Sequence, residues 1–261
     1  MVIRKKIVKK KPEEEQKKIV LSISDLHKAY GKKEVLKGLS IDVFEGEIFG
    51  LIGKNGIGKS TTIDCVVGSK IFEKGDITID GISISHDPIK AKKAYGYVSS
   101  EPALYEMMTG YEYLSFIASI YSVIPSIYKS NLQILSQKFD LPAKDLHSKI
   151  SSYSHGMKQK LCLMASMIHN PKVWILDEPT VGLDVMVYQS LVQVMKEFAR
   201  HGRTVFVTSH NLDMVAKICN RVAIVNDGKI AKLIDLDKEP QYRQNLSKVF
   251  FEIYQREEDV N

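Results

Sequence analysis

The stretch Gly53–Thr61, which reads "GKNGIGKST", decides the fold that this chain of 261 residues is expected to adopt. It fits the pattern G-x-x-x-x-G-K-[ST] of a phosphate-binding loop. The apolar residues "EIFGLI" precede it and predict a buried strand, and a helix is expected from Gly58 to about Val67. Because the motif stands between a strand and a helix, we interpret it as a phosphate site and not as a glycine-rich turn without a ligand.

The loop supplies several groups that bind phosphate. Its glycines let the backbone wrap tightly and turn its N–H groups inward, and the helix adds the positive end of its dipole. Lys59 is predicted to reach the β- and γ-phosphates, the Ser60 hydroxyl to bind magnesium, and Thr61 to bond an α- or β-phosphate oxygen. The nucleotide-binding residues predicted here are Gly53, Asn55, Gly56, Gly58, Lys59, Ser60 and Thr61.

The sequence on both sides of the loop predicts an α/β fold. The segment "IVLSISDLHKAYG", from Ile19, alternates apolar and polar residues as a half-buried strand does, and "VLKGLSIDVFEGEIFGLIG" predicts two strands joined by a turn at Glu45-Gly46. Four later apolar runs are dense in Val and Ile: "YGYVSS", "VWILDE", "TVFVTSH" and "VAIVNDG". Helix-like stretches separate most of them, which is typical of buried parallel strands.

Acidic residues end one of these predicted strands. The segment "VWILDEPT" places Asp177 and Glu178 at the carboxyl end of the strand, the edge at which open α/β sheets bind ligands. Such a pair can be mere surface charge. Beside a phosphate loop, however, we interpret Asp177 as a magnesium ligand and Glu178 as the base that orients or deprotonates the attacking water. His210 ends "TVFVTSH" at the same edge. A histidine there is often structural, but its imidazole could also bond the γ-phosphate.

The strand signal disappears between about residues 102 and 168. The segments "YEYLSFIASIYSVI" and "IYKSNLQILSQKF" are helical by spacing and composition. A helical subdomain is therefore expected at 102–168, inside a nucleotide-binding domain of residues 19–238. Residues 1–18 are mostly Lys, Arg and Glu, which favours a disordered, solvated tail over a lipid-binding arm. Residues 239–261 are expected to form a short C-terminal extension.

Composition excludes several classes of protein. The cysteines Cys65, Cys162 and Cys219 are not spaced as a zinc knuckle or a redox pair, so reduced thiols are expected. A net charge of +6 is only a weak pointer to nucleic acid or anionic lipid. No apolar run approaches the ~18 residues of a membrane helix, and the basic N-terminus leads into acidic residues, unlike a signal peptide. The chain is expected not to span a membrane by itself.

One stretch has no obvious partner near it in the sequence. "SSYSHGMKQKL", Ser151–Leu161, is a small polar turn that opens a Lys-rich helix, with no nucleophile–base pair or metal-ligand spacing. Together with the other motifs, it resembles the nucleotide-binding subunits of ATP-binding cassette (ABC) transporters from about Leu21 to Lys232. "YSHGMKQKL" resembles the family signature motif, "VGLD" at Val181–Asp184 the D-loop, and His210 the switch histidine. Six motifs agree in order and spacing.

The resemblance implies a P-loop NTPase (RecA-like) core with an antiparallel β subdomain and a helical signature subdomain. It implies ATP and Mg2+ as cofactors and ATP hydrolysis as the activity. Tyr30, in "LHKAYG", stands where the family stacks an aromatic ring on adenine. In the family two subunits meet head to tail, so that Ser154, Gly156 and Asp184 would complete the site of a partner ATPase. A two-fold dimer would then hold two shared sites.

The sequence departs from the family pattern at two places. His155 stands where the signature motif usually has glycine. In "YGYVSSEPALYE", Ser100 stands where most members carry a glutamine that touches magnesium and the attacking water. A serine is too short for the same contact, so either a water bridges the gap, or Glu101 substitutes, or the contact is lost.

Three kinds of family member remain possible. The segment "SSEPALYEMMTGYEYLSF" resembles ATPase subunits of bacterial drug, antibiotic or polysaccharide exporters. We therefore favour an export ATPase at the cytoplasmic face of the bacterial plasma membrane, as a homodimer or with a paralogous subunit, bound to a multi-pass permease. An importer ATPase is the nearest alternative, and a mechanical or signalling ATPase that acts without transport is the other. No nucleic-acid partner is expected, because the chain has a single cassette and no sustained heptads.

Overall fold

The structure is a computed structural model that describes residues 17–100, 103–180 and 183–258, with side chains as far as residue 255. The predicted tail of residues 1–18 therefore lies outside it except for its last two residues. Among the described residues, no helix combines the length and the apolar character that crossing a membrane requires.

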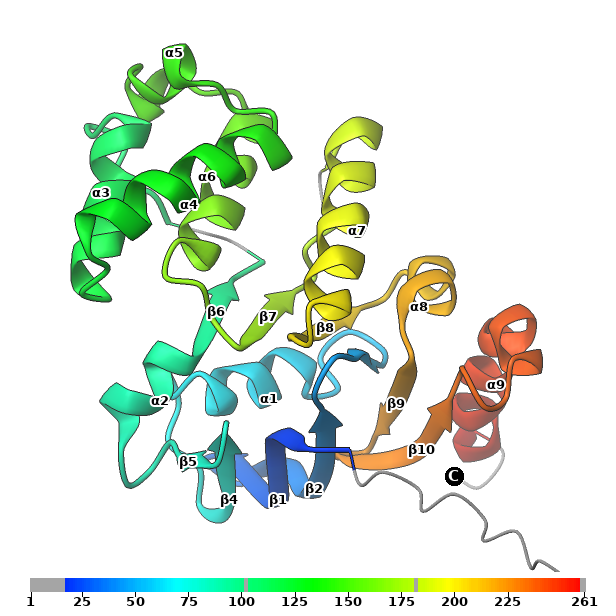
Figure 1. Cartoon of the computed structure of the whole chain (residues 1–261). Helices are drawn as coiled ribbons and strands as arrows, with labels where there is room; N and C mark the ends of the chain where they lie inside the picture. Colours follow the sequence, from blue (N-terminus) through cyan, green and yellow to red (C-terminus); the bar gives the residue numbers. More distant parts are fainter. Residues whose placement is uncertain (1–16, 101–102, 181–182, 259–261) are drawn as a thin grey trace, which may run out of the picture.

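A six-stranded sheet forms the centre of the molecule (Figure 1). Its strands are parallel except for β10, which pairs antiparallel with β9. In spatial order they are β10 (Lys229–Asp235), β9 (Arg221–Asn226), β3 (Ile48–Ile52), β8 (Thr204–Ser209), β7 (Val173–Asp177) and β6 (Tyr95–Val98). The apolar runs predicted to be buried parallel strands are the parallel strands of this sheet, which confirms the α/β fold class.

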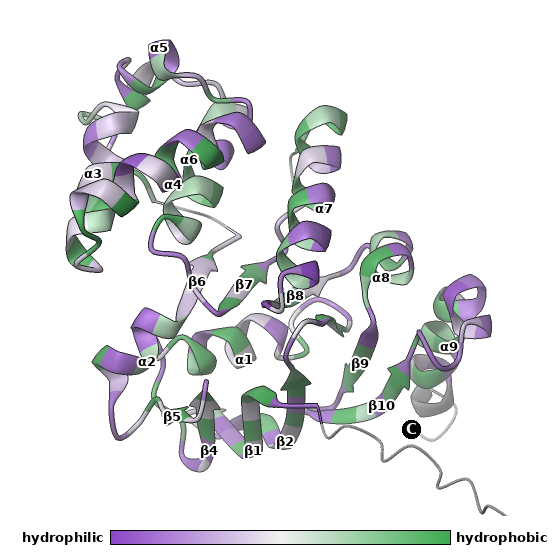
Figure 2. Cartoon of the chain, in the orientation of Figure 1, coloured by the Kyte–Doolittle hydropathy of each residue, from purple (hydrophilic) through white to green (hydrophobic). Residues whose placement is uncertain are grey.

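Both faces of β3, β7, β8 and β9 are buried, in two different hydrophobic cores. Along β7, Trp174 and Leu176 point to one core while Val173 and Ile175 point to the other. This alternation follows from the two-residue period of a strand. Because neither face meets water, the strands need no polar positions, and Figure 2 accordingly colours β7 and β9 mostly green. Ligands can approach only at the ends of the strands.

A second sheet packs on one side of the first. It is antiparallel and contains, in order, β2 (Lys33–Phe44), β1 (Ile19–Tyr30), β4 (Lys74–Ile79) and β5 (Ile82–Ser83). The predicted turn at Glu45-Gly46 is present, but it joins strands of different sheets, since β2 is antiparallel and β3 lies in the central sheet. Helix α1 (Lys59–Val66) lies between the two sheets (Figure 1), and α2 (Pro88–Ala94) follows β5.

A mainly helical lobe connects β6 to β7. It contains α3 (Gly110–Ile120), α4 (Pro125–Lys138), α5 (Ala143–Leu146), the 3-10 turn η1 (Ile150–Ser152) and α6 (His155–Met167). Helix α3 starts with a capping box in which the side chains of Thr109 and Glu112 each accept a hydrogen bond from the other residue's backbone. A proline in the first turn starts α4.

The helical lobe is fixed to the sheet by a close approach of two backbones. A Cβ atom added to Gly96 of β6 would lie 1.9 Å from the carbonyl oxygen of Ser166 in α6. The hydroxyl of Ser166 also accepts a hydrogen bond of 2.9 Å from the indole of Trp174 in β7. The C-terminal part of α6 is therefore held against the sheet at a point where no side chain larger than hydrogen fits.

In the described part of the chain, three helices follow β7. They are α7 (Val185–Arg200), α8 (Leu212–Ile218) and α9 (Gln241–Glu258). Helix α9 lies within residues 239–261, which were expected to form a short C-terminal extension without a predicted helix. In the structure Leu246, Phe250 and Tyr254 are buried, which places one face of α9 against the core. Their spacing of four residues is a helical signal that is present in the sequence.

Candidate functional site

The phosphate loop joins the end of β3 to the start of α1. Gly56 and Gly58 have positive φ angles of 76° and 115°. At Gly58 a Cβ atom would also approach the Leu36 side chain in β2 to 2.8 Å, so glycine is required there on two grounds. At Gly56 a Cβ would meet nothing within 4 Å, so only its backbone angle favours glycine.

Lys59 is the cationic centre of the loop. It is buried, with 5% of its surface exposed. Its ammonium donates hydrogen bonds to the carbonyl oxygens of Gly53 (2.9 Å) and Lys54 (3.3 Å). It also lies 3.6 Å from Glu178 Oε1. The loop thus curls around its own lysine and directs it towards the carboxylate that ends β7.

Asp177 is the buried acid of the pair at the end of β7. Its Oδ1 accepts hydrogen bonds from the hydroxyls of Thr208 (2.6 Å) and Ser60 (3.3 Å). Burial raises the pKa of Asp177 above its ordinary value, and these two hydrogen bonds only partly offset the effect. A carboxylate that burial disfavours in its charged form is suited to a cation, and the oxygen donors of Asp177 and Ser60 are those that Mg2+ prefers.

Glu178 is held from several directions. Its backbone adopts a φ of 47°, a left-handed conformation that costs a residue with a Cβ roughly 1–2 kcal/mol. Its N–H donates to the carbonyl (3.2 Å) and the hydroxyl (3.0 Å) of Thr208. Its Oε2 accepts from the backbone N–H (3.1 Å) and from Nδ1 (2.8 Å) of His210. Strain at a residue fixed in this way is typical of functional sites.

Thr208 connects the two acids and was not anticipated from the sequence. Its hydroxyl donates to Asp177 and accepts from the Glu178 backbone, and the residue is fully buried in β8. A threonine beside a serine near the end of the otherwise apolar run "TVFVTSH" was the available signal. Thr208 fixes the ends of two neighbouring strands relative to each other.

These contacts bring predicted nucleotide-binding, metal-binding and catalytic residues to one edge of the sheet. Lys59 and Ser60 come from α1, Asp177 and Glu178 from the end of β7, and His210 from the residue after β8. The cluster combines a buried cation, a buried acid with a raised pKa and a second carboxylate fixed by hydrogen bonds. Such a set can bind a phosphate chain, hold a divalent cation and position a water for in-line attack.

The residues predicted to act across a dimer lie on the surface. Ser154 is exposed and caps α6, its hydroxyl accepting 3.2 Å from the N–H of Met157. Asp184 is exposed and caps α7, accepting from the N–H groups of Met186 and Val187, both at 2.9 Å. A Cβ atom on Gly156 would lie 3.5 Å from Asp184 Oδ2, so the starts of α6 and α7 are neighbours.

Other predicted residues lie in different positions. Tyr30 ends β1 at the tip of the β1–β2 hairpin, with 46% of its surface exposed and the Lys28 ammonium 5.3 Å from its ring centre. Thr61 is half-buried and Asn55 exposed. Ser100 is exposed and lines a small hollow with Gln159 and Glu178. Glu101, and Val181 and Gly182 of the predicted D-loop, lie outside the described residues.

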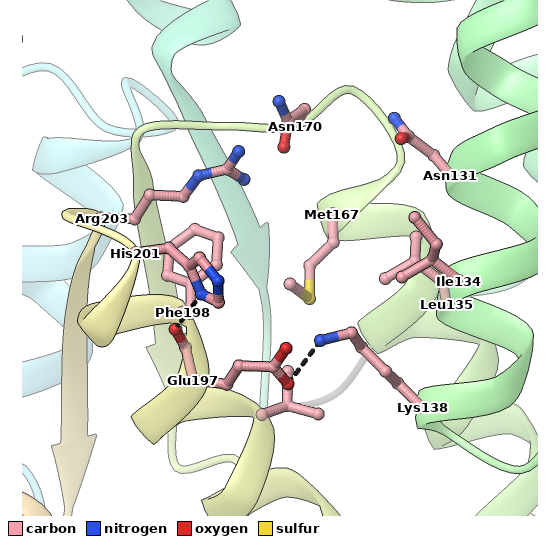
Figure 3. A pocket seen from close by; sticks show the side chains of 11 residues that line it. Asn131, Ile134, Leu135, Lys138, Met167, Asn170, Glu197, Phe198, His201 and Arg203 are labelled. Atoms are coloured by element: carbon pink, nitrogen blue, oxygen red, sulfur yellow. Dashed lines mark hydrogen bonds and ion pairs between the residues drawn. The ribbon is translucent and has the colours of Figure 1, made fainter.

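A cavity of about 440 Å³ lies elsewhere, between α4, the end of α6 and α7 (Figure 3). It contains none of the predicted site residues. Lys138 of α4 and Glu197 of α7 face each other across it and form an ion pair of 2.5 Å. This pair joins the helical lobe to α7, and we assign the cavity no role in binding nucleotide.

Comparison with known proteins gives consistent matches. The family model described as "ABC transporter" matches residues 36–181. The linearmycin resistance ATP-binding protein LnrL of Bacillus subtilis (strain 168) is 37% identical over 81% of this chain and 68% of that protein. The lantibiotic transport ATP-binding protein SrtF of Streptococcus pyogenes is 31% identical over 88% of this chain and 96% of that protein.

A solved structure agrees in fold and in sequence. The structure described as the ATP-binding subunit of an ABC transporter superimposes with a TM-score of 0.84 at 30% identity, and the match covers 90% of this chain and 99% of that one. The match therefore includes both sheets and the helical lobe, and not only the phosphate loop.

Proposed function

This chain belongs to the ABC transporter family as one of its ATP-binding, ATP-hydrolysing subunits, and from that premise we propose that it drives export through a separate membrane permease. The observation that carries the proposal is the cluster of Lys59, Asp177, Glu178 and His210 at one edge of the central sheet, in a chain that also exposes a signature turn (Ser154–Gly156) at the start of α6. The relatives named for linearmycin resistance and lantibiotic transport support export of an antibiotic-like compound.

We infer the following roles for ATP binding. The N–H groups of the loop and the ammonium of Lys59 would hold the phosphates, and Tyr30 would stack on the adenine. Because Lys59 lies 3.6 Å from Glu178 Oε1, phosphate would compete with this carboxylate for the ammonium. Binding ATP would then free Glu178 to interact with water. Ser60 and Asp177 would hold Mg2+, which neutralises developing charge on the phosphates.

Hydrolysis would depend on Glu178. Two hydrogen bonds from His210 occupy Oε2, so Oε1 remains the oxygen that can accept a proton from a water. His210 has 58% of its side chain exposed, which leaves it accessible to a partner and to the γ-phosphate. It would therefore orient the base and respond to the state of the nucleotide.

A second ATPase subunit would complete each site. Ser154, Gly156 and the N-terminal end of α6 offer a hydroxyl, a backbone N–H and a positive dipole end, which suit the phosphate of a nucleotide held by the partner. The exposed Val185 and Met186 at the start of α7 lie beside them and would be covered in the same contact. Either a second copy of this chain or a paralogue would serve as the partner.

The permease would dock where the helical lobe meets β6. A cavity of about 410 Å³ is present there, and its lining includes Tyr97, Tyr113, Ile117 and Tyr121. Tyr105 and Met107 nearby in sequence are exposed. A short amphipathic helix from a membrane protein would find apolar and aromatic contacts in this cavity. The protein would then lie peripherally at the cytoplasmic face of the plasma membrane.

Two experiments test the proposal. Lys59→Ala should abolish binding of ATP, since it removes the charge that faces the phosphates.

Affinity purification of the full chain from detergent-solubilised membranes, followed by peptide identification, should recover a multi-pass permease. Recovery of the chain without any membrane protein would favour a mechanical or signalling ATPase. A captured permease that moves its substrate inwards in vesicles would favour an importer.

A further inference from the structure

We propose that Tyr254 of α9 is a positioning residue for the phosphate loop, and that the C-terminal helix thereby sets the affinity of the chain for ATP. The proposal rests on ATP binding at Gly53–Thr61. It concerns a residue 200 positions further along the chain than the loop that it contacts.

The hydroxyl of Tyr254 bridges the loop and the central sheet. It accepts a hydrogen bond of 3.1 Å from the backbone N–H of Lys54, and it donates one of 2.5 Å to the carbonyl oxygen of Val225 in β9. Tyr254 is buried, with 5% of its surface exposed. A single oxygen atom therefore connects the second residue of the loop to a strand that takes no part in binding phosphate.

The hydrogen bond from Lys54 to Tyr254 and the hydrogen bond from the Lys59 ammonium to Gly53 involve the same peptide group. The carbonyl of Gly53 and the N–H of Lys54 belong to one planar peptide group. Lys59 donates to the carbonyl at 2.9 Å, and Tyr254 accepts from the N–H. Because the group is planar, it cannot rotate without disturbing both contacts. Tyr254 therefore fixes the carbonyl on which the Lys59 ammonium rests.

The ring of Tyr254 reinforces this geometry. The Lys54 ammonium lies 4.7 Å from the ring centre, within the range of a cation–π contact. The Phe250 ring packs against it, with centres 4.9 Å apart. A Cβ atom on Gly53 would lie 2.7 Å from the Ile57 side chain and 3.2 Å from the Tyr254 hydroxyl, so a side chain at Gly53 would crowd this contact.

Helix α9 is itself fixed at its other end. Arg243 donates 2.6 Å to the carbonyl of Ala216 in α8 and 2.6 Å to Asp237. Leu246 and Phe250, one and two turns further on, are buried in the core. The position of the Tyr254 hydroxyl is thus determined by the packing of the whole helix.

The test is Tyr254→Phe in the full chain, which removes one oxygen atom and keeps the ring. The matched control is Tyr242→Phe on the same helix. Tyr242 also has a lysine ammonium, that of Lys232, 4.7 Å from its ring centre and 3.4 Å from its hydroxyl, but it contacts β10 and not the loop. Each variant is measured by equilibrium binding of ATP, by steady-state hydrolysis and by hydrogen–deuterium exchange of the peptide that contains Lys54.

Tyr254→Phe should weaken ATP binding and raise KM by about 3- to 20-fold, in line with the loss of one or two buried hydrogen bonds. The kcat at saturating ATP should stay within about twofold, because bound phosphate restores the loop. The Lys54 amide should exchange faster in Tyr254→Phe without nucleotide, and Tyr242→Phe should match the wild type in all three measurements.

Two results would overturn the proposal. One is a Tyr254→Phe protein that melts at a lower temperature but binds ATP and exchanges Lys54 like the wild type, since that describes a residue of the core only. The other is an equal loss of affinity in both variants, which would indicate general loosening of α9. A wild-type chain that binds no ATP would count against the nucleotide site itself. The hydrogen–deuterium exchange measurement needs no ligand, so it would still show whether the Tyr254 hydroxyl protects the Lys54 amide.

Discussion

His210 donates two hydrogen bonds to one oxygen of Glu178, from its backbone N–H at 3.1 Å and from Nδ1 at 2.8 Å. The backbone bond fixes where the carboxylate lies regardless of the imidazole. The imidazole bond can break without releasing Glu178. The exposed ring of His210 can therefore change partner while the carboxylate of Glu178 keeps its place.

Glu178→Gln should separate binding from hydrolysis. The amide keeps the size of the carboxylate and can still accept from His210, but it cannot take a proton from water. Turnover should fall by about 10²–10⁴-fold, the usual effect of losing a general base, while ATP is still bound. A nucleotide-binding assay alongside phosphate release measures both. Failure of the variant to hold ATP would show that Glu178 serves in binding.

The Glu178→Gln protein should also accumulate as a dimer with ATP trapped between its subunits. Adding Ser154→Arg should prevent this, because a bulky side chain would stand where the γ-phosphate of the partner docks. ATP binding by each subunit should persist, since Lys59 and its loop are unchanged. Light scattering with and without ATP follows the assembly.

Ser115→Arg in the same background is the control for that experiment. It adds the same charge to an exposed serine on a different helix, α3. The control should dimerise with ATP as the parent does. A dimer that forms equally well with Ser154→Arg would leave the signature turn without a function and would remove the main support for shared sites.

Asp177→Asn should lose magnesium-dependent hydrolysis and gain stability without nucleotide. Burial raises the pKa of Asp177, so the folded protein binds a proton at this site more tightly than the unfolded chain does. The ionised carboxylate therefore costs stability at every pH above the unfolded value of about 3.9. Thermal melts near neutral pH should show a higher Tm for the variant, and the difference should shrink towards about pH 4. A lower Tm at neutral pH would contradict this account.

His169 should make the protein sensitive to mild acid. Burial lowers its pKa to about 4, and its Nε2 lies 2.9 Å from the carbonyl oxygen of Tyr95. Because the folded pKa lies below the unfolded one, its contribution to stability is complete above about pH 6.5 and is lost as the pH falls to about 4. The free energy of unfolding should drop by roughly 2–3 kcal/mol through this group between about pH 7.5 and 4.5.

His169→Gln tests this assignment, because glutamine can still donate to Tyr95 but does not titrate in this range. Urea unfolding at the two pH values should give a smaller acid-induced loss in the variant than in the wild type. An identical loss in both proteins would mean that other groups account for the acid sensitivity.

Much of the fold could be predicted because the signals are local. The phosphate loop lies between β3 and α1 as expected, and the runs dense in Val and Ile are buried strands. The assignment of β2 and β3 to different sheets could not be predicted, because strand periodicity does not reveal the partner of a strand. Helix α9 was missed although Leu246, Phe250 and Tyr254 recur at a helical spacing of four residues, because the sequence does not show which surface of the domain this apolar face packs against.

The site was predictable residue by residue but not as a set of contacts. Lys59, Asp177 and Glu178 each stand in a recognisable pattern. The left-handed backbone of Glu178, its double contact with His210 and the bridge made by Thr208 depend on how neighbouring strands end. The contact between Tyr254 and Lys54 joins residues far apart in the chain, and no motif records it.

The close approach of Gly96 to Ser166 fixes the C-terminal end of α6 to the sheet, so a tilt of the helix would pivot about this point. Ser154, at the opposite end of the helix, lies 12 residues from Ser166, which corresponds to a lever arm of about 18 Å along an α-helix. A tilt of about 5° at the fulcrum would then move Ser154 by about 1.5 Å, enough to make or break a hydrogen bond. A small rotation of the helical lobe would therefore cause a larger displacement of the signature turn. A side chain larger than hydrogen at Gly96 would separate α6 from β6 at the pivot point and weaken the coupling between the lobe and the turn.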